Sequence, residues 1–266
     1  MKSLVYSPLS CGLFLVLCLV YGSGFYLFVQ SSVWLTFVLT LMLPVLFWPL
    51  TKPVENAIEI KRILCLETGF NLLCFLAVSQ WVSVEYVDKG LVVFFVLQSA
   101  GFIMVQIRKH AYLSVLISMV LAATIIHWIN IGAQTTLRGE GDILLFDEAV
   151  PWQLKLIYGF WLMQLLLVEY RSVLPKLTLV ICHIASFAIA FCAEDFFHAR
   201  IVTASHLLFL SLCFNLRSLD WGGERFVVSK YLSNYIQHPI FNELLPKFIF
   251  FISIATYISF FFTKSN

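Results

Sequence analysis

The chain has 266 residues, of which 61% are hydrophobic and 12% are charged, and its mean hydropathy is +0.91. Soluble globular domains are about 45 to 50% apolar and about 25% charged, so this composition excludes a soluble domain and indicates an integral membrane protein. The net charge of +2 identifies no partner. No basic stretch is interleaved with aromatic residues, which excludes a nucleic-acid-binding protein.

Long apolar runs follow one another along the chain. Several approach or exceed the ~20 residues that a helix needs to cross a ~30 Å hydrocarbon core, which favours an all-α, polytopic transmembrane helical bundle over a β-barrel. We predict a single integral-membrane domain over residues 1–266, with the lipid bilayer as its surroundings. Its nine expected spans are residues 9–29, 32–50, 62–84, 90–107, 111–134, 153–170, 173–193, 199–216 and 246–262.

The first 24 residues carry a second interpretation. They contain Lys2, an apolar core and a small-residue end at residues 22–24, which are features of a cleaved secretory signal. Cleavage there would leave eight spans and would invert none of them.

The basic residues predict how the chain is threaded, because Lys and Arg concentrate on the cytoplasmic side of membrane proteins. With the N-terminus in the cytoplasm, twelve basic residues lie inside and five lie outside, namely Lys89, Arg138, Lys155, Arg200 and Lys264. We therefore expect a cytoplasmic N-terminus, an outer C-terminus and a multi-pass protein of the plasma (inner) membrane.

Two connections have a pattern of their own. The cytoplasmic connection 217–246 contains an apolar helical face, which predicts a helix in the inner membrane interface beside Trp221; the face consists of Val227, Val228, Tyr231, Leu232 and Tyr235. The alternative is a helix that docks a membrane or cytoplasmic protein partner. The outer connection 135–152 has a Gly-Glu-Gly-Asp turn followed by apolar residues, and we expect it to fold back against the outer interface.

Several sharper motifs are absent from the sequence. The seven cysteines lie in apolar runs without a CxxC pair, so neither a disulfide framework nor a zinc ribbon is indicated. There is no Walker A loop and no G-x-S-x-G elbow.

Polar residues inside the spans are the candidate site residues, because such groups are costly in lipid and usually face the bundle interior. On a rise of ~1.5 Å per residue, they form a series from the outer face toward the membrane centre. The series consists of His198, Glu194, Asp195, Asn130, His127, His183 and His206.

Three chemistries are compatible with this series. Neutral imidazoles can relay protons, because one nitrogen accepts while the other donates. His127, His183 and His206 could instead hold a zinc, copper or iron ion, or ligate a haem. The third alternative is structural, with each polar group forming hydrogen bonds between helices. No spacing selects among them, so a metal cofactor stays open.

Glu67 is the only acidic residue well inside a span, and Asn71 and Cys74 continue its helical face. A glutamate in this position can carry protons, or it can pair with Arg62 or Arg108 near the inner headgroups.

Three functions follow as hypotheses. The polar stripes favour a carrier of a small solute, ion or proton, with its path between the fifth, seventh and eighth spans. An intramembrane enzyme that uses a metal or acid/base groups on a lipid-linked or membrane substrate at the outer leaflet is the second. A non-catalytic membrane subunit, immunity or assembly factor is the third.

Overall fold

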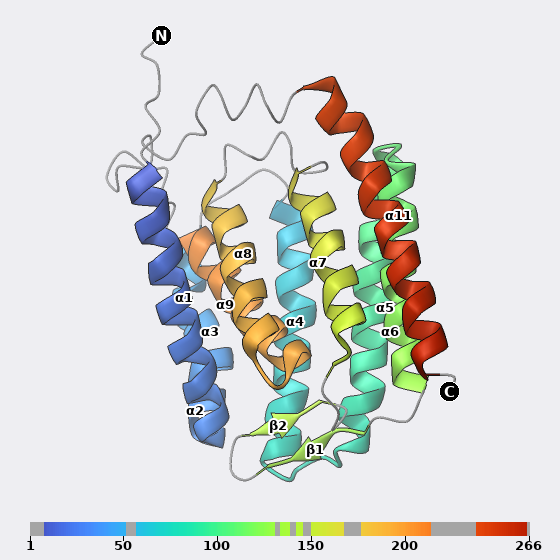
Figure 1. Cartoon of the computed structure of the whole chain (residues 1–266). Coiled ribbons are helices and arrows are strands. Elements are labelled where there is room, and N and C mark those ends of the chain that lie inside the picture. Colours follow the sequence, from blue (N-terminus) through green and yellow to red (C-terminus); the bar gives the residue numbers. More distant parts are fainter. Residues whose placement is uncertain are drawn as a thin grey trace. The chain divides into compact units, whose positions relative to one another are not determined.

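A computed structural model of the chain describes residues 8–51, 57–130, 134–138, 142–145, 150–167, 177–213 and 238–264 (Figure 1). Each of the nine apolar regions contains a helix in the part described, but the third, predicted to reach residue 84, ends as a helix at Val78, and residues 79–84 form a turn in which Gln80 has a positive φ of 62°. The helices are α1 (Pro8–Ser31), a composite of α2 (Val33–Phe37), η1 (Val38–Met42), α3 (Leu43–Phe47) and η2 (Trp48–Leu50), then α4 (Ala57–Val78), α5 (Glu85–Arg108), α6 (Tyr112–Asn130), α7 (Trp152–Leu167), α8 (Leu177–Cys192), α9 (Phe196–Cys213) and α11 (Pro239–Lys264).

Six helical segments of the described chain are long and apolar enough to cross a membrane. They are Gly12–Ser31, Val33–Leu50, Glu85–Arg108, Tyr112–Asn130, Phe196–Cys213 and Glu243–Thr263. The described apolar part of α8, Val180–Cys192, is shorter, and α4 carries Lys61, Arg62 and Glu67. The structure agrees with the predicted all-α membrane bundle. The number of spans and the threading stay predictions.

The chain divides into two compact units, each described by itself. The first comprises residues 1–94, 133–149 and 176–227, and α9 is its central helix. Sixteen of the eighteen residues of α9 are buried, and it packs against α8, α1 and α4. The approach of α1 to α8 is close, because a Cβ on Gly22 would lie 2.7 Å from Cδ1 of Ile189. A larger residue at this crossing would therefore require the side chain of Ile189 to move.

The composite segment 33–50 is an interrupted helix in this unit. Pro44 has no N–H to donate to the carbonyl of Thr40, so the regular ladder breaks there. The chain widens into the π-helix η1, where the amide of Leu43 bonds the carbonyl of Val38. The hydroxyl of Thr36 donates to the carbonyl of Val29 at 2.6 Å and so ties this segment to the end of α1.

The outer connection forms a small antiparallel hairpin of β1 (Thr136–Leu137) and β2 (Ile143–Leu144). Its apolar residues Ile143, Leu144 and Leu145 are buried within the unit. Its predicted place at the outer interface stays a prediction. The amide of Leu145 donates to Asp195 at 2.6 Å, and Gln30 donates to Asp142 at 3.1 Å. These bonds fix the hairpin to the turn between α8 and α9 and to the end of α1.

The second unit comprises residues 95–132, 150–175 and 228–266, in which α6, α7 and α11 pack against one another. The helix α11 begins at Pro239, seven residues before the expected start of the last span. The predicted interfacial helix within 217–246 lies outside the described residues, apart from the part that belongs to α11.

Candidate functional site

A buried polar cluster joins α8 to α9 in the first unit. The guanidinium of Arg200, whose residue is 5% exposed, donates to the hydroxyl of Ser186 at 2.6 Å and lies 3.2 Å from Nδ1 of His183. Ser186 also shares a hydrogen bond of 2.8 Å with Thr203. A buried charge is tolerated only when hydrogen bonds or an opposite charge compensate it, so these contacts explain why Arg200 can lie inside the bundle.

Arg200 corrects the sequence-based threading. It was counted among the five outer basic residues, because the eighth span was expected to begin at residue 199. The helix α9 in fact begins at Phe196, so Arg200 lies more than a turn inside it. Arg200 is therefore a buried cation within a helix, which the expected site did not contain.

Glu67 and Asn71 approach this region from α4. Glu67 is 8% exposed, and its Oε2 has no hydrogen-bond partner among the described residues. Arg200 is close enough to act on it electrostatically, so the neighbouring cation comes from α9. Asn71 donates to the hydroxyl of Ser205 at 3.5 Å, while its carbonyl oxygen has no described partner.

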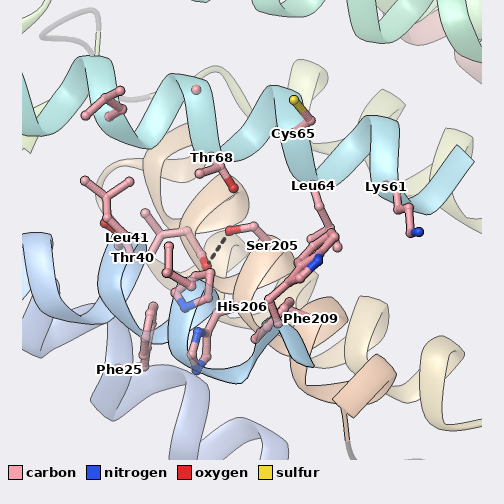
Figure 2. Close-up of a pocket in the computed structure, with 16 residues that line it drawn as sticks. Phe25, Thr40, Leu41, Lys61, Leu64, Cys65, Thr68, Ser205, His206 and Phe209 are labelled. Carbon is pink, nitrogen blue, oxygen red and sulfur yellow. Dashed lines mark hydrogen bonds between the residues drawn. The ribbon is translucent and has the colours of Figure 1, made fainter. Parts of the chain in front are cut away.

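A cavity of about 580 Å³ lies between α1, the composite segment, α4 and α9, and is called here the α4–α9 cavity (Figure 2). Its wall is mostly apolar, with a few polar side chains. The lining residues used below are Lys61, Thr68, Gly69, Ser205 and His206. Lys61 lies at one end, 6.0 Å from the ring centre of Trp48, and is exposed.

His206 is the only ionisable residue besides Lys61 and Cys65 among the residues that line this cavity. Its ring stacks on Phe25, with centroids 3.9 Å apart; both side chains are labelled in Figure 2. Its Nε2 lies 2.8 Å from the hydroxyl of Tyr21, and its Nδ1 has no described hydrogen-bond partner. One ring nitrogen is thus engaged, and the other is available as a donor or an acceptor.

The turn between α8 and α9 carries the predicted carboxylates. Asp195 is buried and accepts hydrogen bonds from the amides of Leu145 and His198, and the second of these caps α9. Burial nevertheless raises the pKa of Asp195 to about 7. Glu194 is exposed and pairs with Arg138 at 2.7 Å. These two neighbours therefore have different roles, a buried cap and a surface pair.

His198 was expected at the outer surface but is buried. Its ring lies edge-on to Tyr26, with centroids 5.9 Å apart, and its Nδ1 has no described hydrogen-bond partner. The residue lies in the first turn of α9, below the cap that Asp195 provides.

His127 and Asn130 belong to the second unit. His127 lies beside two phenylalanines of α11, stacking on Phe261 at a centroid distance of 5.3 Å and meeting Phe260 edge-on. Asn130 is exposed at the end of α6. In the described part of the chain, no three His, Cys, Asp or Glu side chains come together as ligands for a metal ion. The predicted metal set of His127, His183 and His206 does not fit this arrangement.

Sequence reasoning missed Arg200, Tyr21 and Lys61 as site residues. The signal for Arg200 was present, because Asp195 is a favoured N-cap residue directly before an apolar helical run. Tyr21 meets His206 across 185 positions of the chain, and no local pattern predicts such a contact. No protein-family model, curated protein or solved structure matches the chain, so the site is argued from its own geometry.

Proposed function

We propose that the protein is a membrane carrier that binds a lipid-like, anionic molecule in the α4–α9 cavity. The observation that carries this proposal is the cavity itself. Its volume of about 580 Å³ is within the range of about 300 to 1,000 Å³ typical of ligand sites. Its wall combines a long apolar surface with a few polar groups, which is the pattern that an amphipathic ligand requires.

The charge of Lys61 indicates how an amphipathic ligand would be oriented in the cavity. Lys61 and Leu72 both line the cavity and are eleven residues apart on α4, about 16 Å at a helical rise of ~1.5 Å. The proposed threading has nine spans and a cytoplasmic N-terminus, which puts Lys61 near the inner headgroups. An anionic headgroup beside Lys61 would then have its hydrocarbon chain inside the membrane, about halfway across the ~30 Å core.

The route differs from the one that the sequence suggested. That route ran between the fifth, seventh and eighth spans and used His127, His183 and His206. The cavity is lined instead by the first, second, third and eighth predicted spans, and His206 is the member of the histidine series that it includes. Enzymatic and purely structural roles stay alternatives, and the experiment below separates them.

The test is binding and movement of a nitroxide-labelled alkyl sulfonate, which stays anionic at any working pH, in proteoliposomes. Spin-label mobility measures binding, and ascorbate added outside measures movement, because it reduces only exposed label. Gly69→Leu fills the cavity, since a Cβ there would have no atom within 4 Å. Gly12→Leu is the matched control, because Gly12 is equally open but does not line the cavity.

Saturable binding and movement in the wild type and in Gly12→Leu, with both lost in Gly69→Leu, would support the proposal. A nitroxide-labelled alkyl alcohol that binds equally well would overturn the anionic headgroup. Binding without movement would contradict a carrier and favour a structural subunit or an enzyme. Absence of binding would overturn the proposal as a whole.

A further inference from the structure

Two opposite charges are buried behind the wall of the α4–α9 cavity, and they are held differently. Arg200 is fixed from α8 by Ser186 at 2.6 Å and His183 at 3.2 Å. Glu67, on α4, has one carboxylate oxygen without a described hydrogen-bond partner. Ionisable groups inside a bilayer are expensive, which makes each of them a candidate functional group. Oε2 of Glu67 has no described donor to stabilise a negative charge, so it is the atom at which we expect a proton to bind.

Several elements contribute titratable groups around Glu67. The helix α9 contributes Arg200 and, on the cavity side, His206. The α2 and η1 segments, which also pack against α4, contain no titratable residue. The helix α5, whose Phe94 lies against Phe70 of α4, carries Glu85, Tyr86, Asp88 and Lys89 in its first turns. Arg62 and Cys74 belong to α4 itself, and His183 reaches this group through Arg200. The cation that acts electrostatically on Glu67 is therefore Arg200, and both side chains belong to the first unit.

The two buried charges also connect to the cavity. Thr68, the neighbour of Glu67, lines the cavity, and so does Ser205, which accepts a hydrogen bond from Asn71 one turn beyond Glu67. Electrostatic interactions act over several ångströms in a medium of low dielectric constant. A change of charge at Glu67 would therefore alter the electrostatic free energy of an anion bound in the cavity.

We propose that Glu67 is a proton-binding site, and that its protonation is coupled to an anionic occupant of the α4–α9 cavity. With Glu67 ionised, its charge balances that of Arg200. When the carboxylate takes a proton from water, it becomes a neutral carboxylic acid and Arg200 keeps its positive charge. The pair then has a net charge of +1, which attracts the anion, so one proton and one anion would bind together. The coupling rests on the proposed carrier function, whereas the proton site does not.

The proton site can be tested without any ligand. Infrared difference spectra recorded between pH 5 and 9 should contain two protonated carboxyl components, one from Glu67 and one from Asp195, whose pKa is about 7. The Glu67 band should titrate in the wild type and be missing in Glu67→Gln, whereas the Asp195 band should be missing only in Asp195→Asn. Glu85→Gln, at the start of α5, is the control and should keep both bands. If Glu67→Gln does not fold, Glu67→Asp should shift the Glu67 band rather than remove it. Identical spectra for the wild type and Glu67→Gln would overturn the proton site.

The coupling is tested with the alkyl sulfonate, because that probe does not itself titrate. Linkage of one proton predicts that its affinity falls up to tenfold per pH unit as the pH rises through the titration of the Glu67 infrared band. In Glu67→Gln the affinity should be independent of pH. A pH-independent wild type that still binds would overturn the coupling alone. Failure of the wild type to bind overturns the carrier, and the infrared band still decides the proton site.

Discussion

The two units of the chain use buried polar residues in different ways. In the second unit the bonded groups are neutral: Ser118 donates to Gln106 at 2.8 Å and accepts from the indole of Trp161 at 3.0 Å, and Gln164 donates to Ser114 at 2.9 Å. In the first unit the corresponding cluster contains a guanidinium, imidazoles and a carboxylate.

The two units differ in whether their hydrogen-bonded buried groups can change charge. Neutral amides and hydroxyls keep the same charge at every physiological pH, so the second unit's bonds only hold helices together, at about 0.6 kcal/mol each. The first unit's groups can change charge, and one of them borders a cavity. Four predictions test this contrast, beginning with the largest expected effect.

Replacing Arg200 by methionine should destabilise the protein most. The change removes a buried guanidinium that donates to Ser186 at 2.6 Å, lies 3.2 Å from Nδ1 of His183 and acts electrostatically on Glu67, and hydrogen bonds of a charged group contribute about 1.5 to 3 kcal/mol. We expect a large drop in the thermal unfolding midpoint in detergent, followed by tryptophan fluorescence. The double variant Arg200→Met, Glu67→Gln should recover a substantial part of the loss.

The matched control for this prediction is Arg138→Met. Arg138 pairs with Glu194 on the surface, where the two side chains are 46% and 69% exposed, so its loss should cost at most about 1 kcal/mol. Equal effects of the two arginine substitutions would contradict the difference between the buried arginine and the surface pair.

Stability should depend on pH through Asp195. Its pKa of about 7 in the folded protein exceeds the ordinary value of 3.8. Between these two values the folded state holds more protons than the unfolded state, so the free energy of unfolding falls as the pH rises from about 4 to 7. Burial raises the pKa of Asp142 as well, which adds a contribution of the same sign.

Asp195→Asn is the variant that isolates this contribution. The amide keeps a carbonyl oxygen to cap α9, and it cannot ionise. Unfolding midpoints measured from pH 4 to 8 should therefore vary less in Asp195→Asn than in the wild type. An unchanged slope would show that Asp195 is not the group responsible.

Ser118→Ala should have a smaller effect. It removes two hydrogen bonds between neutral groups, and we expect a loss of about 1 kcal/mol that is the same at pH 5 and pH 8. The measurement is again the unfolding midpoint. A loss that varies with pH would contradict the neutral character of the second unit's polar contacts.

His127→Phe should have the smallest effect, because a phenyl ring keeps the aromatic contacts with Phe260 and Phe261. We expect unchanged stability and unchanged binding of the alkyl sulfonate, within error. A loss of binding would restore His127 to the site that the sequence suggested.

Hydropathy predicted the helices well, because a membrane span is recorded in the composition of a contiguous stretch. Helix ends were predicted less accurately: the eighth span was expected to begin at residue 199 with Arg200 at its outer edge, although Asp195 caps α9 and Arg200 lies more than a turn inside it. One misplaced helix start thus concealed the cation of the candidate site.

The meeting of helix faces could not be predicted from one sequence. His206 was chosen correctly as a buried polar residue, but its neighbours Tyr21 and Phe25 come from the opposite end of the chain. The histidine series was built from depth along each helix alone, which does not say which side chains face each other. His127 illustrates this, since its ring contacts α11, an element that the predicted path did not include.

The π-helix η1 has a consequence for selectivity. It ends at Met42, two residues before Pro44; Pro44 and Val45 line the cavity, as do Thr40 and Leu41 within η1. Conversion of its wide turn to a regular α-helical turn would shift the register by one residue and rotate the following wall by about 100°. The rotation would change which side chains of this segment face the cavity. The cavity could then accept ligands of different width without any change in sequence.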